Sequence, residues 1–205
     1  MDRTELLTSL HLDKFIALDF ETTGLNIDSD RIIEVAAILF IDGLPSKRYN
    51  TLVNPGIPIP KLIEQITGIT NDMVVDSPKE KEIVDDLFKF IGSYPLVAHN
   101  TPFDLSFLKS VASRYNHDYV DREYYDTLTL SRAFLFFQPA HNLTAISDYY
   151  GFSTDGAHRA EYDTENCGKI FVELIEEASS YKLDLISRII SLLQPFQSHN
   201  KNLFI

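Results

Sequence analysis

The sequence predicts an α/β fold in which a mixed β-sheet is covered by helices. Segments rich in β-branched and aromatic residues come early in the chain, as expected for strands. From Pro78 onward the apolar residues follow a helical period, interrupted by one short apolar segment typical of a buried strand. An antiparallel meander followed by alternating strands and helices is typical of a mixed sheet with helices on its faces.

The first three predicted strands form the meander. They span residues 15–20, 32–41 and 49–53, and Asp42-Gly43 between the last two predicts a hairpin turn. A fourth, short strand is predicted for residues 95–99, "PLVAH".

The helices follow these strands. After Pro78, one helical face carries Ile83, Leu87, Phe88 and Ile91. Further helices are predicted at residues 102–115, 127–136, 143–150 and 161–181. We expect residues 1–181 to form one domain. Residues 182–205 begin as an amphipathic helix and end apolar, so they either pack on the domain or lead to a further domain or a partner.

Composition limits the class of protein. The single cysteine, Cys167, and a first segment without a basic region followed by an apolar run predict a soluble, cytoplasmic protein. No segment reaches the roughly 18 apolar residues of a membrane span. The net charge of -12 argues against a protein that binds long nucleic acid by its own charge. An enzyme that holds a strand end through metal ions stays possible, because bound cations reverse the local charge.

Asp19 and Glu21 are unusual acidic residues, since they follow a strongly apolar strand. Side chains two positions apart on a strand point to the same face, so two negative charges are held side by side. Burial and like charge both disfavour ionisation of such a pair. The pair is either satisfied by backbone donors and an arginine, or it binds a cation.

Three other polar residues have ordinary interpretations when taken singly. Asp104 could be a favourable acid in the first turn of a helix that has Thr101 as its N-cap and Pro102 at its first position. Asp163 could likewise be a first-turn acid, and His158 a solvated loop residue.

Taken together, these residues predict a metal site. Each of three sequence blocks places a carboxylate where an element begins or ends, and such ends gather at one edge of a sheet. Four converging carboxylates without a cysteine suit hard divalent cations, Mg²⁺ or Mn²⁺, and Asp19 could bridge two of them. His158 precedes Asp163 by five residues, which suits a general base on a loop above the site.

The three blocks resemble the motifs of a known enzyme group. "DFETTGL", "HNTPFD" and "HRAEYD", which begin at Asp19, His99 and His158, are similar to the three motifs of the DEDDh 3'-to-5' exonucleases. This group includes the epsilon proofreading subunit of bacterial DNA polymerase III and exonuclease domains fused to helicases. A sister group has Tyr at the position of Arg159, so this chain does not resemble that group. The Arg159 side chain could touch phosphate, but a pairing with Glu161 is the simpler expectation.

The resemblance implies a ribonuclease H-like fold with a five-stranded mixed sheet, and a role for each signature residue. Asp19, Glu21 and Asp163 would hold the ion that carries the attacking water. Asp19 would also hold a second ion, Asp104 would support the site, and His158 would take the proton. The implied cofactors are two Mg²⁺ or Mn²⁺ ions.

The resemblance also implies contacts to the substrate. Thr23, Gly24 and Leu25 would meet the terminal nucleotide, with Leu25 as a wedge between the last two bases. Phe103 would pack against the end base and Asn100 would brace the site. The alternative interpretation of these residues is a turn and a core aromatic.

The implied function is removal of nucleoside monophosphates from the 3' ends of single-stranded DNA. RNA or short oligonucleotides are the alternative substrates. A catalytically inactive scaffold for a polymerase or helicase is the alternative class of protein. A polymerase, a helicase or a sliding clamp are the expected partners.

Overall fold

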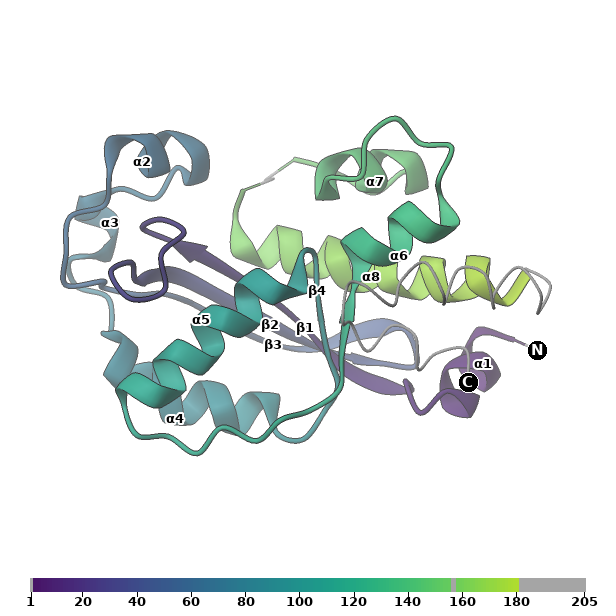
Figure 1. The fold of residues 1–205 in the computed structure, drawn as a ribbon, viewed down its shortest axis with the longest axis horizontal. Helices are drawn as coiled ribbons and strands as arrows, with labels where there is room; N and C mark the ends of the chain where they lie inside the picture. The colour runs from purple at the N-terminus through teal and green to yellow at the C-terminus, as the bar shows by residue number, and fades with distance from the viewer. Residues whose placement is uncertain (1, 156–157, 181–205) are drawn as a thin grey trace.

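The computed structural model describes residues 2–155 and 158–180, and a five-stranded sheet lies at its centre (Figure 1). The strands are β1 (Lys14–Thr22), β2 (Ile32–Ile41), β3 (Leu44–Leu52), β4 (Leu96–Ala98) and β5 (Tyr124–Asp126). They lie in the order β3-β2-β1-β4-β5. The first three form an antiparallel meander, and β4 and β5 add to it in parallel with β1. The long strand β1 is therefore central.

Helices cover both faces of this sheet. They are α1 (Arg3–Ser9), α2 (Lys61–Thr67), α3 (Asn71–Val74), α4 (Glu80–Ile91), α5 (Thr101–Arg114), α6 (Thr127–Phe134), α7 (Leu143–Tyr150) and α8 (Ala160–Ser180). In Figure 1, α4 and α5 lie on the opposite side of the sheet from α6, α7 and α8. None of the helices in the described part of the chain is long and apolar enough to cross a membrane.

The alternation of side chains along β1 divides the core into two layers. Phe15 and Ala17 belong to the cluster shared with α6, α7 and α8. Ile16, Leu18 and Phe20 belong to the cluster shared with α4 and α5. Because successive strand residues point to opposite faces, every odd-numbered residue of β1 is directed toward the α8 side.

Helix α8 lies directly against the strands. A Cβ atom added to Gly168 would come within 2.2 Å of the Phe40 ring on β2, so a larger residue would force helix and sheet apart. The Thr164 hydroxyl donates a 3.4 Å hydrogen bond to the Ala36 carbonyl of the same strand. This close packing fixes where the first turn of α8 lies relative to β1 and β2.

The predicted elements are largely confirmed. The strand at residues 32–41 and the helix at residues 143–150 have the predicted bounds, and most others differ by one to three residues. The third strand was predicted too short, because its solvent-facing half lacks an apolar pattern. Helices α1, α2 and α3 and the short strand β5 were not predicted individually. The predicted helix and tail at residues 182–205 lie outside the described residues.

Candidate active site

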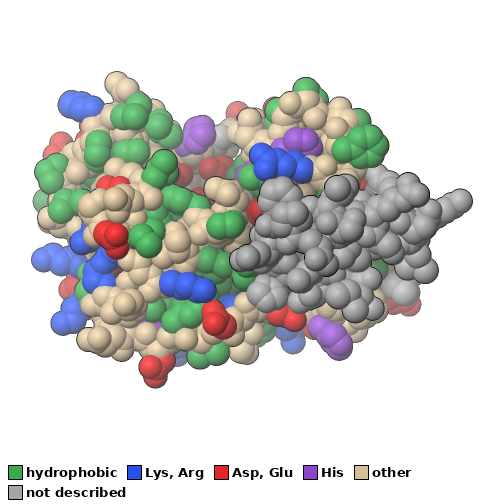
Figure 2. Space-filling view, viewed as in Figure 1, with side chains coloured by type: hydrophobic (Ala, Val, Ile, Leu, Met, Phe, Trp, Pro, Cys, Tyr) green, Lys and Arg blue, Asp and Glu red, His purple; other side chains and the backbone are tan. Residues whose placement is uncertain are grey.

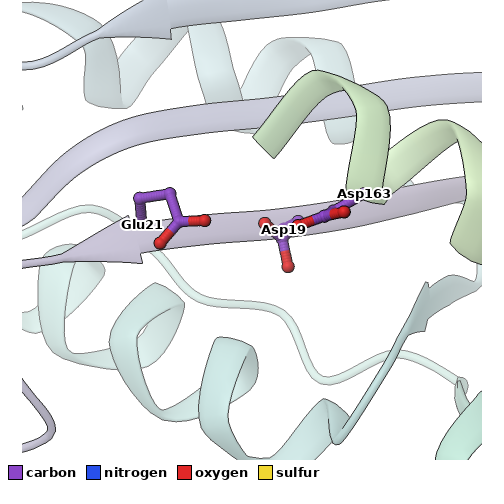
Figure 3. A group of neighbouring side chains, drawn as sticks. All are labelled: Asp19, Glu21 and Asp163. Atoms are coloured by element: carbon purple, nitrogen blue, oxygen red, sulfur yellow. The ribbon is translucent and has the colours of Figure 1, made fainter. Parts of the chain in front are cut away.

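Two carboxylates continue the row of β1 side chains that faces α8. Phe15 and Ala17 are buried in this row. Asp19 and Glu21 are its next members, and they lie at the end of the strand where α8 begins (Figure 3). The strand period that buries the apolar residues therefore also directs both acids toward the first turn of α8.

Asp163, in the first turn of α8, completes a cluster of three carboxylates. One carboxylate oxygen from each of Asp19, Glu21 and Asp163 lies within 4.8 Å of the other two. In Figure 3 the side chain of Asp163 reaches toward Asp19 from the start of the helix. Within residues 2–155 and 158–180, no lysine or arginine forms an ion pair with any of the three. Of the two interpretations of the strand pair, satisfaction by an arginine ion pair is therefore not seen among these residues.

The cluster is electrostatically strained. Burial, followed by the charges of Asp163 and Glu34, raises the pKa of Asp19 to about 8. Burial and then the charge of Asp19 raise the pKa of Glu21 to about 9. Burial also raises the pKa of Asp163, against an opposing hydrogen bond from the His158 amide. Carboxylates held in this way favour a proton or a metal cation at neutral pH.

Asp104 approaches the cluster from the other layer of the fold. It lies in the first turn of α5, is 2% exposed, and its Oδ1 atom accepts a 3.2 Å hydrogen bond from the Phe20 amide. Burial and then the charge of Asp19 raise its pKa well above the ordinary value. The structure therefore places Asp104 beside Asp19 but outside the group of three ligand oxygens.

His158 lies in the turn that leads directly into α8. Its φ angle of 66° is in the left-handed region that few non-glycine residues adopt. Its side chain is exposed, and its backbone N–H donates a 3.0 Å hydrogen bond to Asp163 Oδ2. The predicted loop position is confirmed. The backbone of His158 is thereby tied to one of the three clustered carboxylates, and its imidazole is open to solvent.

The loop after β1 is held together by Asp30. The Thr23 hydroxyl donates to Asp30 Oδ1 at 2.9 Å and accepts from the Arg31 amide at 3.0 Å. A Cβ atom on Gly24 would lie 2.5 Å from the Asp30 carboxylate, which explains the glycine. Thr23 and Gly24 thus have structural contacts within the loop, and Leu25 is left 83% exposed at its surface.

Asn100 is the cap residue of α5, which corrects the prediction that Thr101 would be the N-cap. Asn100 has a left-handed φ of 70°, and its backbone N–H donates a hydrogen bond to Asp126 Oδ1 at 2.8 Å. Thr101 lies inside the helix, and its hydroxyl is within hydrogen-bonding distance of the carbonyls of Ala98, at 3.1 Å, and Tyr125, at 2.8 Å. A local capping rule failed because these partners come from β4 and β5.

The side chains at the start of α5 differ in exposure. Asn100 is exposed, whereas Phe103 is half-buried and its ring centroid lies 5.1 Å from that of Phe107. Phe103 is therefore partly a core aromatic and partly available at the surface, which leaves both predicted interpretations compatible with its position.

Two residues, Asp126 and Glu34, were not assigned to the neighbourhood of the site from the sequence. Asp126 accepts hydrogen bonds from the amides of Asn100, at 2.8 Å, and Leu128, at 3.2 Å, so it links the starts of α5 and α6. Glu34 is 1% exposed on β2, opposite Glu21 in the strand register. A charged residue inside the apolar run "RIIEVAAILFI" was the available signal for Glu34, and an N-cap position before Thr127 was the signal for Asp126.

Arg159 pairs with Glu34, and the predicted pairing with Glu161 is wrong. The guanidinium donates to Glu34 Oε1 at 2.9 Å and to Oε2 at 3.2 Å. Glu161 instead accepts a hydrogen bond from Asn50 and lies 3.5 Å from the Arg48 guanidinium. The prediction considered only neighbours in sequence, whereas the true partner lies on strand β2.

The donor set fits a hard divalent cation. It consists of carboxylate oxygens, it is buried enough to disfavour bare charge, and its three members come from two rigid elements, β1 and α8. Figure 2 shows the surface hollowed between the part of the molecule with α2 and α3 and the part with α6 and α7. Acidic and histidine side chains are visible at this notch.

The comparison with protein families decides the family. Residues 16–171 match the family described as Exonuclease. The chain belongs to the exonuclease family. It is 31% identical over 163 residues to the DNA polymerase III subunit epsilon of Aquifex aeolicus, a match that covers 80% of this chain and 81% of the relative. It is 32% identical over 190 residues to the 3'-5' exonuclease DinG of Bacillus subtilis, covering 92% of this chain.

The solved structures agree with this membership. The complex titled "Exonuclease X in complex with 5' overhanging duplex DNA" matches with a TM-score of 0.62 and 25% identity, over 86% of this chain and 98% of that one. The predicted ribonuclease H-like fold and the predicted DEDDh exonuclease family are thus confirmed. This chain spans only 20% of the length of the Bacillus relative, which is a much longer protein.

Proposed function

We propose that this chain is a metal-dependent 3'-to-5' exonuclease that removes nucleoside monophosphates from the 3' ends of single-stranded DNA. The observation that carries the proposal is the cluster of Asp19, Glu21 and Asp163, whose oxygens lie within 4.8 Å of one another. It occurs in a chain of the exonuclease family, and no lysine or arginine among the described residues forms an ion pair with it.

The four acids would hold two divalent ions, Mg²⁺ or Mn²⁺. Asp19, Glu21 and Asp163 are the proposed direct ligands, and Asp104 supports Asp19 from α5. When bound, such ions neutralise phosphate charge and stabilise the attacking and leaving oxygens of a phosphoryl displacement. The fixed orientation of β1 and α8 keeps the carboxylates in place without reorganisation during the reaction.

His158 is the proposed general base. Its imidazole accepts a proton from the attacking water as the new bond from oxygen to phosphorus forms. The bond from phosphorus to the 3'-oxygen of the preceding nucleotide breaks, and that oxygen takes a proton from solvent water to become the hydroxyl of the new 3' end. The products are a nucleoside 5'-monophosphate and a strand shorter by one nucleotide.

The loop after β1 and the start of α5 are the proposed contacts to the 3' end. Leu25, exposed at the loop surface, acts as a wedge between the last two bases, and Phe103 packs against the end base. Asn100 braces the site, while Thr23 and Gly24 hold the loop backbone close to the nucleotide. A wedge favours single strands, because unpairing a base costs a few kcal/mol.

DNA is the proposed substrate. The support is that several similar proteins are named as DNA polymerase III subunits, and that a similar structure is titled as a complex with DNA. RNA and short oligonucleotides are the alternatives, since the described site has no contact that selects the sugar.

We also propose that residues 1–181 work as an exonuclease module beside a polymerase, a helicase or a sliding clamp. The support is that the chain matches only 13% of a PolC-type DNA polymerase III and 20% of DinG. Because the whole chain has a net charge of -12, we expect the module to release a strand after few cuts when no partner is present. The buried free thiol of Cys167 fits the reducing conditions of the cytoplasm.

One set of digestions tests the activity and the substrate. Single-stranded DNA, RNA of the same sequence, blunt duplex DNA and dinucleotides, each with a 5' label, are incubated with the protein in Mg²⁺ and in EDTA. We expect a ladder of products shortened from the 3' end, on single-stranded DNA first and only with Mg²⁺. Equal rates on blunt duplex would contradict the wedge, preference for RNA would change the substrate, and no cleavage in any arm would leave a scaffold.

A further inference from the structure

A buried carboxylate next to the site contacts the turn that carries His158. Glu34 on β2 faces α8, and three hydrogen bonds reach it. Two come from the Arg159 guanidinium, at 2.9 and 3.2 Å, and one from the Ala160 amide, at 3.1 Å. Both donors immediately follow His158 in the chain. The side chain of Glu34 is only 1% exposed, whereas that of Arg159 is 40% exposed.

The arrangement ties the turn to the sheet. A buried carboxylate must be compensated by charge and by hydrogen bonds, and a guanidinium that binds both oxygens does this with a fixed geometry. The Ala160 amide is one of the N–H groups at the start of α8 that have no partner inside the helix. Glu34 therefore holds both the side chain before α8 and the first amide of α8.

The same turn holds a proposed metal ligand. The amide of His158, in its left-handed conformation, donates to Asp163 Oδ2 at 3.0 Å. Residues 158–160 thus connect two anchors, Glu34 beneath the turn and Asp163 in front of it. Within residues 2–155 and 158–180, Glu34 is the only hydrogen-bond partner of the Arg159 side chain.

We propose that Glu34 is a positioning residue, which through Arg159 and the Ala160 amide fixes the turn that presents His158 and Asp163 to Asp19 and Glu21. Glu34 does not touch the substrate. The inference rests on the proposed function for its effect on turnover. The ordering of the turn itself does not depend on activity.

A second buried pair in the same protein provides a matched control. Glu80, whose side chain is 3% exposed, forms an ion pair with Arg114 and accepts a 3.0 Å hydrogen bond from the Ile32 amide. Like Glu34, it is buried and has an arginine partner and one backbone amide donor, and in addition it accepts a 3.3 Å hydrogen bond from the Tyr115 hydroxyl. It joins α4, α5 and the start of β2, and among the described residues no hydrogen bond or ion pair connects it to the carboxylate cluster.

The experiment compares Glu34→Gln with Glu80→Gln in three measurements. Amide hydrogen exchange of residues 158–163, followed by mass spectrometry, reports the order of the turn without any activity. Michaelis constants and turnover on single-stranded DNA separate binding from the chemical step. The rise in melting temperature with Mn²⁺ reports the metal ligands.

We expect both variants to lose similar stability, but only Glu34→Gln to affect the turn. Exchange at residues 158–163 should become faster, and turnover should fall by about 10- to 100-fold with little change in the Michaelis constant, as for groups that orient a ligand. Arg159→Lys keeps the charge but loses the bidentate contact with Glu34. Its turnover and its rate of amide exchange should therefore lie between those of Glu34→Gln and wild type.

Three results would overturn the inference: unchanged exchange in Glu34→Gln, an equal loss of turnover in Glu80→Gln, or wild-type turnover in Arg159→Lys. If wild type itself cleaves nothing, the proposed function fails. Faster exchange in Glu34→Gln alone would then still support the positioning of the turn.

Discussion

The two ends of helix α8 differ in whether their acidic residues are paired with an arginine. At the far end, Glu176 accepts hydrogen bonds of 2.6 and 2.7 Å from the Arg3 guanidinium, and Glu173 one of 2.9 Å. These contacts lower the pKa of Glu176. At the first turn, Asp163 has no such partner in the described chain, and burial raises its pKa.

The difference shows that the unpaired charge at the site is specific to that place. The chain places arginines and lysines along the rest of α8, including Arg48 and Lys169 beside Glu165. Arg159 lies close to the cluster, yet it is directed to Glu34. Asp19, Glu21 and Asp163 are therefore left for a ligand that the described protein does not supply, and a divalent cation is the ligand that their oxygens suit.

The largest effect on turnover is expected from neutralising one acid of the cluster. Asp19→Asn should reduce turnover by on the order of 10⁴-fold or more, because several kcal/mol of transition-state stabilisation depend on the ions. The same variant should melt at a higher temperature than wild type in EDTA, since a repulsive buried charge is removed. Turnover assays and thermal melts measure the two effects.

Glu176→Gln is the matched control at the other end of α8. It should keep wild-type turnover and melt at a slightly lower temperature, because its charge is paired. A lower melting temperature for both variants in EDTA would contradict the idea that the cluster is strained without metal.

Removal of the His158 imidazole, in the turn before α8, should have the next largest effect on turnover. His158→Ala should lower turnover by about 10²- to 10⁴-fold, as expected for loss of a general base. The backbone amide that bonds Asp163 is kept, so stabilisation by Mn²⁺ should be nearly unchanged. His11→Ala is a suitable control, because His11 is also exposed and has a positive φ of 57°.

Loss of Mn²⁺ stabilisation in His158→Ala, to the extent seen for Asp19→Asn, would show that His158 serves the metal site and not the proton transfer. Measuring melting temperatures with and without Mn²⁺ for all three variants separates these roles.

The pH dependence of stability sharpens the comparison further. In the metal-free protein, the pKa values of Asp19 and Glu21 are raised to about 8 and about 9. Between about pH 4 and these values the folded state binds more protons than the unfolded chain, so the free energy of unfolding falls as pH rises. The stability that protonation of Asp19 and Glu21 contributes is fully present below about pH 4 and is lost near pH 9.

Mg²⁺ should remove this loss, because it stabilises the ionised carboxylates. Melting temperatures of wild type in EDTA and in Mg²⁺ should therefore diverge as pH rises from 5 to 9, by about 5 °C or more at the upper end. Asp19→Asn should show a smaller divergence. Parallel curves for wild type in EDTA and Mg²⁺ would refute a metal site.

The smallest effect is expected where the acids are paired. Arg3→Ala leaves Glu173 and Glu176 without their partner, but all three side chains are partly exposed to solvent. We expect a loss of about 1 kcal/mol or less in the free energy of unfolding, and no change in turnover. Urea unfolding measures the first, and a fall in turnover would show that the far end of α8 is connected to the site.

Local patterns in the sequence predicted much of the site. The period of two along β1 placed Asp19 and Glu21 on one face, and the structure confirms their proximity. The strand at residues 32–41 and the helix at residues 143–150 were predicted to the residue, because the strand is an apolar run that ends at Asp42-Gly43 and the helix lies between Asn142 and Gly151. The order of the three motif blocks predicted the family.

Predictions failed where partners are distant in the chain. Arg159 was assigned to Glu161, two positions away, whereas its partner Glu34 is 125 positions away. Strand β5 has only three residues, which is too short for a period to be read. Asp126 at its end therefore went unnoticed, although it holds the amide of Asn100.

The sequence alone determined which residues are the candidates for the chemistry, because motif spacing and side-chain period are local properties of the chain. Only the tertiary structure decided how these residues are supported. The α8 face of the sheet receives Asp163 because Gly168 allows the helix to approach Phe40. The turn of His158 depends on Glu34 because a buried charge must find its partner wherever the fold brings one near. Such contacts follow from packing in three dimensions, which no local pattern contains.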